Sequence, residues 1–302
     1  MRKIGTIIVR LLTLVTVAFC VVACDFTEDC SFKGPVKVFV DYSAIDSELR
    51  EQIPDSMQTN IAFISRDCMA NTSFHRLRSN PLYLSKAVGE YDVLYYSMCG
   101  NREILNIQDP FMAVISSPTY FLPDGRKSIS AEEKPLFSAE PQGVIVEEED
   151  STELFFTAHP VGKYIIMYMK VEHLETGKVL TCTGTLEGVS TSYRISDATI
   201  GEENVAVRFS MSDKDVPAGY DLTRRLSVLG IHKGSNNCCF DLTFSNATPV
   251  NLDIDLTDVL EKAQRDVILL YISADLTPVS PSIGIDKWED KDWDDIGELE
   301  AQ

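Results

Sequence analysis

Short stretches that alternate between apolar and polar residues recur along this chain and constrain its fold more than any other feature. Residues 36–42 read Val-Lys-Val-Phe-Val-Asp-Tyr, so the valines and Tyr42 share one face of a strand while Lys37 and Asp41 take the other. Residues 250–256 alternate in the same way. Short strands with turn signals such as Asn80-Pro81 between them are typical of β-sandwiches. An all-β fold is therefore predicted.

The same pattern places further strands in both halves of the chain. The expected strands are 61–65, 82–85, 90–97, 112–116, 163–171, 179–186, 191–196, 204–210, 226–232, 239–244 and 267–273. Only two segments favour a helix. Ser43 can cap a turn that ends before Pro54, and Thr257 can cap residues 258–263.

Length and composition predict two domains in tandem. The 279 residues from Cys24 to Gln302 exceed the usual size of a single core. Between Asp124 and Gln142 the chain becomes rich in Lys, Glu, Ser and Pro, which indicates a boundary. The expected division is a linker at 24–34, β-sandwiches at 35–138 and 139–283, and an acidic segment at 284–302. That last segment is expected to be either a solvated terminus or an adhesive strand.

Residues 1–23 are typical of an export signal. Basic residues precede a short apolar run, and the segment closes on Val-Val-Ala before Cys24. This ending resembles the bacterial lipobox, whose cysteine is acylated and becomes the first residue after cleavage. We therefore expect a lipid attached at Cys24. The alternatives are an uncleaved membrane anchor and an ordinary cleaved signal, but the apolar run after Arg10 is shorter than the roughly 20 residues that a spanning helix needs.

The charge of the chain excludes one class of partner. Loss of residues 1–23 removes three bases and no acids, which changes the net charge from −19 to −22. Nucleic-acid binding needs clustered bases to neutralise phosphates, so a nucleic-acid role is not expected. Electrostatic adsorption to anionic lipid is disfavoured for the same reason, and membrane attachment would depend on acyl chains.

Six cysteines remain once Cys20 is lost with the signal and Cys24 carries lipid. An even number in an exported protein permits disulfides, and buried free thiols are the equal alternative. The pairing to test first is Cys68 with Cys99, because both lie in the first half. Adjacent Cys238 and Cys239 would face opposite sides of a strand, which disfavours a shared metal site.

No motif in the sequence indicates catalysis or a cofactor. The four histidines lack metal-ligand spacing, and neither a Gly-x-Ser-x-Gly elbow nor a phosphate loop is present. Asp290-x-Asp292-x-Asp294 imitates a calcium loop, but Asp295 replaces its glycine and Ala301 its final glutamate. A non-enzymatic protein without cofactor or metal is expected. Two tyrosine groups, 91/95/96 and 164/168, favour core packing over a carbohydrate-binding face.

Several segments in order resemble the FimB-like fimbrial anchor and fimbrillin-like lipoproteins of Bacteroidales. They are Cys24 with Cys30, the strand at 36–42, Gly89–Tyr96, Gly184–Val189, Phe240–Thr243, Leu256–Leu260 and Ile283–Asp290. The resemblance covers nearly the whole chain after the signal. Cys68, Cys99 and the Cys238-Cys239 pair depart from the family pattern.

The resemblance implies two transthyretin-like β-sandwiches and a place in the outer membrane, held by lipid on Cys24. It also implies a role in anchoring or assembling a fimbria-like polymer related to the type V pilus, in which one chain inserts a strand into another. The expected partners are fimbrillin-like subunits or another envelope β-protein, together with outer-membrane lipid. The alternative is a surface lipoprotein that binds glycan or an envelope protein without polymerising.

Overall fold

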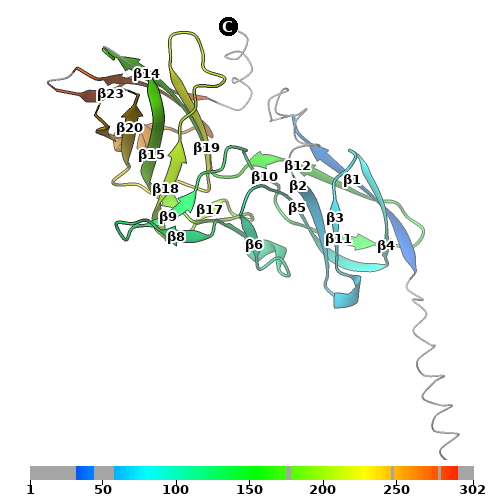
Figure 1. The fold of residues 1–302 in the computed structure, drawn as a ribbon. Helices are drawn as coiled ribbons and strands as arrows, with labels where there is room; N and C mark the ends of the chain where they lie inside the picture. The colour runs from blue at the N-terminus through cyan, green and yellow to red at the C-terminus, as the bar shows by residue number, and fades with distance from the viewer. Residues whose placement is uncertain (1–31, 44–57, 175–177, 246–247, 278–279, 292–302) are drawn as a thin grey trace, which may run out of the picture.

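Strands dominate the structure, a computed structural model that describes residues 32–43, 58–174, 178–245, 248–277 and 280–291 (Figure 1). The helices within these ranges are η1 (Met69–Asn71), η2 (Pro110–Met112) and α3 (Thr257–Lys262). None of them is long and apolar enough to cross a membrane. The all-β fold predicted from alternation is confirmed.

The first sandwich consists of a small sheet, sheet A, and a larger one, sheet B (Figure 1). Sheet A has the order β12 (Thr152–Thr157), β1 (Lys33–Asp41), β4 (Leu82–Ala87). Sheet B has the order β13 (His159–Pro160), β10 (Phe137–Ser138), β5 (Gly89–Met98), β2 (Gln58–Ser65), β3 (Ser73–Arg76), and β11 (Gln142–Val146) also pairs with β5. β1 is parallel to β12 and antiparallel to β4.

The core of the first sandwich lies between sheets A and B. Val36, Val38 and Val40 of β1 are all buried, as their alternation predicts. They pack with aromatic residues from the facing sheet, among them the fully buried Tyr91 and Tyr95. Large apolar side chains of this kind supply most of the stabilisation of a sandwich.

The second sandwich pairs a six-stranded sheet D with a four-stranded sheet E (Figure 1). Sheet D has the order β21 (Val250–Asp255), β20 (Asn237–Phe244), β15 (Val179–Ser190), β18 (Asn204–Ser210), β9 (Lys127–Ser130), β8 (Thr119–Phe121). Sheet E has the order β19 (Leu222–Val228), β14 (Lys163–Glu172), β22 (Val267–Asp275), β23 (Ser282–Lys291). The core between the two sheets includes Met167 and Leu270 of sheet E and Phe240 of sheet D.

A small fifth sheet, sheet C, connects the two sandwiches. It has the order β17 (Thr199–Ile200), β16 (Ser192–Arg194), β7 (Val114–Ser116), β6 (Glu103–Leu105). A separate apolar cluster joins Leu94 of sheet B to Ile115 and Tyr193 of sheet C and to Leu229, which follows β19. A buried apolar contact of this kind restrains the relative motion of two domains.

The two sandwiches are interleaved along the chain, which differs from the expected boundary between residues 138 and 139. Strands β8 and β9 precede that boundary but belong to sheet D, and β11 and β12 follow it but belong to the first sandwich. The chain therefore crosses between the sandwiches more than once. The Lys-, Glu- and Pro-rich composition at 124–142 marks one crossing segment and not the end of a domain.

The ends of the chain are described only in part. β23 contains residues 284–291 of the expected acidic segment and pairs with β22 along the edge of sheet E. The remaining residues of that segment, the signal at 1–23, most of the linker at 24–34 and the expected helix after Ser43 lie outside the described residues. The second expected helix is confirmed as α3, although Leu256 occupies its N-cap position in place of Thr257.

Candidate functional site

The residues predicted to carry function are not brought together in this structure. Cys24, the expected lipid-bearing residue, lies outside the described residues, as does Cys30. Cys68 and Cys99 are free thiols. Cys68 follows the end of β2 whose Ser65 pairs with Tyr91, and Cys99 follows Met98 at the opposite end of β5. A disulfide needs Cα atoms within about 7 Å, so the predicted pairing is wrong.

The remaining described cysteines belong to the core of the second sandwich or to its surface. Cys238 is fully buried and its neighbour Cys239 is only partly buried, which confirms that they face opposite sides of β20. Burial raises the pKa of the Cys182 thiol to about 12 and that of Cys238 well above its usual value. Thiols held neutral in this way are neither nucleophiles nor metal ligands.

The tyrosine groups are core residues, as predicted. Tyr91 and Tyr95 are completely buried in the first sandwich, and Tyr96 packs in the cluster at the junction with sheet C. Tyr164 and Tyr168 are also buried, on the outer side of sheet E. Within the described ranges no three His, Cys, Asp or Glu side chains converge as a metal site would require.

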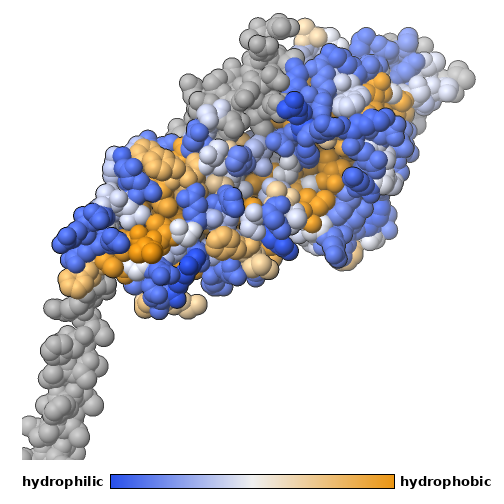
Figure 2. Space-filling view, turned by 180° about the vertical axis from the view of Figure 1, so that it is seen from behind, coloured by the Kyte–Doolittle hydropathy of each residue, from blue (hydrophilic) through white to orange (hydrophobic). Residues whose placement is uncertain are grey.

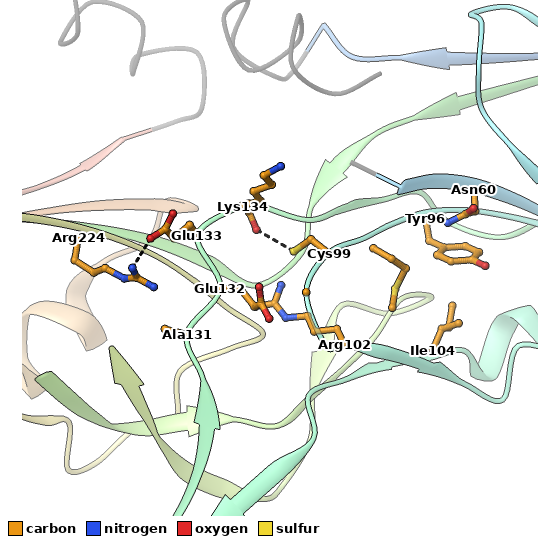
Figure 3. Close-up of a pocket in the computed structure, with 12 residues that line it drawn as sticks. Asn60, Tyr96, Cys99, Arg102, Ile104, Ala131, Glu132, Glu133, Lys134 and Arg224 are labelled. Atoms are coloured by element: carbon orange, nitrogen blue, oxygen red, sulfur yellow. Dashed lines mark hydrogen bonds and ion pairs between the residues drawn. The ribbon is translucent and has the colours of Figure 1, made fainter. Parts of the chain in front are cut away.

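A hollow lies where the two sandwiches meet (Figure 3). This junction cavity has a volume of about 740 Å3. Asn60 of β2 and Tyr96 of β5 line it from the first sandwich, and Arg224 of β19 lines it from the second. The crossing segment at 131–134 runs along the cavity and contributes two glutamates.

Arg102 is the most unusual residue of the junction cavity because its side chain is buried without a carboxylate bonded to it. Its guanidinium donates to Ser227 Oγ at 3.2 Å and to the Ser227 carbonyl oxygen. Its Nε–H finds no acceptor among the described residues. Loss of hydration lowers the pKa of Arg102. The residue therefore ties the start of β6 to β19, across the junction.

Two further contacts hold the crossing segment in place. Arg224 forms an ion pair with Glu133 (Figure 3). The Asn101 backbone N–H donates to Glu132 Oε1 at 3.2 Å. Gly100 has φ +61°, a left-handed conformation that favours glycine, and the Glu132 carboxylate lies close against it.

The chemistry of the junction cavity does not favour catalysis. Its one thiol, Cys99, donates to the Lys134 carbonyl oxygen at 3.5 Å, and burial raises its pKa. No histidine lines the cavity to act as a base. A thiol held neutral is not an activated nucleophile. The cavity is best described as a polar joint between the sandwiches.

An exposed aromatic group marks the outer face of sheet A. The rings of Phe39 and Phe155 are stacked with centroids 4.8 Å apart and an interplanar angle of 1°. Lys37 lies 4.3 Å from the centre of Phe39 and 5.9 Å from that of Tyr83. Phe155 is 60% exposed and Tyr83 is 69% exposed, so this aromatic platform is open to a ligand. On the side of the molecule in Figure 2, apolar and hydrophilic side chains are intermixed.

β4 gives sheet A an open edge next to this platform. Among the described residues no strand pairs with its outer side. The Val88 N–H donates to the Phe32 carbonyl oxygen at 2.8 Å, so Phe32 and Val88 are a hydrogen-bonded pair of the β1–β4 ladder. From there, every second residue of β4 bonds to β1, and the residues between point their backbone groups the other way. By that alternation, the backbone groups of Tyr83 and Ser85 face away from β1. They are positioned to accept an added strand.

Sequence reasoning missed both the junction cavity and the aromatic platform. Arg102 lies in the tripeptide Asn-Arg-Glu, which has no feature that distinguishes a buried arginine from a surface one. Phe39 could have been noticed, because it lies with Lys37 and Asp41 on the face of residues 36–42 that alternation predicts to be exposed. An aromatic residue on the expected solvent face is what a binding surface would show.

Comparison with known proteins finds solved structures with a similar fold. No protein-family model matches the chain, and no curated protein matches it. A candidate adhesin of Bacteroides ovatus matches 84% of this chain and 93% of its own, with 13% identity and a TM-score of 0.54. A second candidate adhesin of that species covers 86% and 94%, with 10% identity and a TM-score of 0.54. A candidate polysaccharide-binding protein of Bacteroides thetaiotaomicron covers 84% and 96%, with 10% identity and a TM-score of 0.51.

At these identities the likeness concerns the fold alone. The structural neighbours are nevertheless Bacteroides proteins, and each match covers most of both chains. This agrees with the resemblance to FimB-like lipoproteins that the sequence suggests.

Proposed function

We propose that this protein is a non-enzymatic lipoprotein of the outer membrane that anchors or helps to assemble a fimbria-like polymer. Lipid on Cys24 attaches it, and an open sheet edge accepts a strand from a fimbrillin-like subunit. The observation that carries the proposal is the combination of a lipobox with a fold shared by candidate adhesins of Bacteroides.

The edge that best fits strand addition is β4. Its Tyr83 and Ser85 backbone groups point away from β1, and the exposed Tyr83 ring lies beside them. An added strand gains affinity from backbone hydrogen bonds and specificity from neighbouring side chains. The other edge of sheet A is less available, because Gln142 Nε2 already donates to the Phe155 carbonyl oxygen of β12 at 2.7 Å.

The lipid anchor is tested by the variant Cys24→Ala. We expect it to leave the membrane fraction, whereas the natural chain remains there and incorporates radiolabelled palmitate. Cys68→Ala is the matched control, since Cys68 is an exposed cysteine far from the signal in sequence. Retention of Cys24→Ala in washed membranes would refute attachment through this residue.

Strand addition at β4 is tested by removing the outward backbone donors. Tyr83→Pro and Ser85→Pro each delete an N–H that β1 does not use, so the ladder to β1 is preserved. We expect both variants to lose co-purification with fimbrillin-like chains of the same cell. Tyr83→Ala keeps the N–H and should retain it. Equal recovery by all three folded variants would show that β4 is not the acceptor edge.

A second candidate function, glycan binding, is favoured by the aromatic platform. Planar exposed rings such as Phe155 and Tyr83 offer apolar faces on which sugar rings can stack. Phe155→Ala and Tyr83→Ala should weaken retention on immobilised cell-surface polysaccharide. Polymer assembly unaffected by these changes, together with lost glycan retention, would favour this function over the first.

A further inference from the structure

Lys86 is a buried cation at the open edge of the first sandwich. Its side chain is 6% exposed and reaches from β4 of sheet A to sheet B, where the ammonium donates to the Ser73 hydroxyl of β3. The ammonium also lies 5.1 Å from the ring centre of Phe63 and 5.8 Å from that of Tyr91. Because β4 and β3 are the last strands of their sheets on this side, Lys86 lies between the two sheet edges.

No carboxylate bonds to Lys86 among the described residues. Its hydrogen-bond partner is the neutral hydroxyl of Ser73, and His75 Nε2, 3.0 Å from that hydroxyl, can add only positive charge. Loss of hydration lowers the pKa of Lys86, and no neighbouring carboxylate counteracts this effect. A buried ammonium without a counter-charge is unfavourable, and a carboxylate placed beside it would offset much of that penalty.

The acids around this corner of the sandwich are directed elsewhere. Asp67 accepts from the Glu90 backbone N–H at 3.0 Å, and the carboxylates of Glu90 and Asp92 both pair with Arg66. The exposed acidic turn at 147–150 leads into β12, which lies on the opposite side of β1 from β4. A carboxylate that compensates Lys86 would therefore come from another segment.

We propose that Lys86 selects an added strand that carries an acidic residue directly opposite it. This inference rests on the proposed function, strand addition at β4, and specifies the partner. The partner is an extended segment of another chain that pairs antiparallel with β4. Its sequence has an acidic residue, then an apolar residue two positions later and a second apolar residue two positions after that.

The hydrogen-bonding alternation of β4 determines where these three residues lie. The backbone groups of Leu82, Leu84 and Lys86 bond to β1, in phase with the pair of Phe32 and Val88. An antiparallel strand on the outer edge would face the three residues in non-hydrogen-bonded pairs, with Cβ atoms about 5 Å apart. In that direction, the residue opposite Lys86 comes first in the sequence of the added strand.

The two leucines account for the apolar part of the pattern. Leu82 and Leu84 occupy the same face of β4 as Lys86 and pack against the core of the first sandwich, but both are only partly buried. Apolar side chains on an added strand would remove more of their surface from water. The added strand would thus extend the core and bring its acidic residue to the ammonium.

The net charge of the chain makes a preference for an acid informative. The formal net charge is −19, so the chain as a whole repels an acidic peptide more than a neutral one. Tighter binding of an acid than of its amide therefore requires a base at the binding site. Lys86 is the base whose position on β4 matches the acidic residue of the pattern.

Peptide binding to the purified full chain tests the inference. The probe is the peptide Lys-Thr-Glu-Thr-Val-Thr-Val-Thr-Lys, and its comparison peptide has glutamine in place of glutamate. We expect the glutamate peptide to bind about tenfold tighter in isothermal titration calorimetry. Lys86→Met keeps the apolar stem and should bind both peptides equally. Lys33→Met is the matched control, since Lys33 is exposed and pairs with Ala87 of β4, and it should keep the preference.

The possible outcomes separate this inference from strand addition itself. Tyr83→Pro removes an outward backbone donor and should abolish binding of both peptides. If both peptides bind the natural chain equally but do not bind Tyr83→Pro, strand addition stands and the role of Lys86 is refuted. A preference for glutamate that survives in a folded Lys86→Met chain, or in Tyr83→Pro, would also overturn the inference. If neither peptide binds the natural chain, strand addition at β4 and this inference fail together.

The comparison of the two peptides on the natural chain does not depend on any variant. Circular dichroism shows whether Lys86→Met is folded, and Lys86→Gln is the second variant if it is not. Lys86→Gln should likewise bind both peptides equally, because it lacks the ammonium. A tenfold preference in the natural chain that Lys86→Gln retains would refute the inference.

Discussion

Sheets A and E, the smaller sheets of the two sandwiches, treat their outer faces in opposite ways. Sheet A exposes Phe155 and Tyr83, whereas sheet E buries Leu269 and Val267. The difference is already present in the strands: β1 alternates between buried and more exposed residues, and β14 is buried over six consecutive positions. An alternating strand indicates a face available to partners, and a continuous apolar strand indicates a face that is already covered.

The sharpest contrast should appear in the thiols of the two sandwiches. Cys68 is exposed beside the first sandwich, and Cys182 and Cys238 are buried in the core of the second. Labelling of the buried pair requires unfolding that costs at least about 5 kcal/mol, so their alkylation should be about a thousandfold slower or more. Site-resolved mass spectrometry after timed iodoacetamide exposure measures these rates. If Cys68 resisted alkylation in a non-reducing sample, a disulfide at Cys68 would be indicated.

Truncating an apolar residue should lower the free energy of unfolding more on the outer face of sheet E than on the outer face of sheet A. Leu269→Ala is expected to cost about 2–5 kcal/mol, the range for a buried leucine. Leu270→Ala, on the inner face of the same strand, should cost a similar amount. Phe155→Ala should change stability by no more than about 1.5 kcal/mol, because its main loss is stacking on Phe39. Urea unfolding followed by circular dichroism compares them, and equal costs for Leu269→Ala and Phe155→Ala would contradict the contrast.

Arg102 tests whether the two sandwiches are coupled. Arg102→Lys keeps a buried charge but cannot reproduce both bonds to Ser227, so we expect a loss of about 1–3 kcal/mol. Arg102→Met removes the charge together with its desolvation cost and should lose less. Differential scanning calorimetry should also show the two sandwiches melting further apart in Arg102→Lys. A single unshifted transition in that variant would show that this contact does not connect them.

The smallest expected effect is a pH dependence confined to the first sandwich. Burial, and then the nearby Lys86, lower the pKa of His75 below its usual 6.5. The folded chain thus disfavours the protonated form, so this contribution to stability is complete above pH 6.5 and decreases as the pH falls toward the lowered pKa. His75 is half-buried, so the loss should be less than about 1 kcal/mol. His75→Gln should flatten stability between pH 7 and 5, as urea unfolding across that range would show.

Local features of the fold could be predicted from the sequence because they depend on neighbouring residues. The alternation of residues 36–42 placed β1 and its buried valines, and the acids after Thr257 marked α3. The opposite orientations of Cys238 and Cys239 followed from strand geometry alone. In each case a short stretch of chain carries the whole signal.

Long-range features could not be predicted in this way. β1 pairs with β12, more than a hundred residues later, and nothing in either strand specifies that partner. The boundary at residue 138 was wrong for this reason, because a change in composition marks a crossing segment as readily as a domain end. The Cys68–Cys99 pairing was wrong because nearness in sequence placed the two residues at opposite ends of one ladder. The buried position of Arg102 could not be predicted, because it depends on the packing of the start of β6 against β19.

The central position of β1 has a mechanical consequence. With the proposed lipid on Cys24, a pull on the body would reach the folded protein first at the start of β1, which is held along its length by β12 and β4. Force applied along a strand between two neighbours loads their hydrogen bonds together in shear, and does not open them one after another. A tether placed there would resist detachment far better than one attached to an edge strand. The same strand that contributes Val36, Val38 and Val40 to the core would then bear the pull of whatever the protein holds.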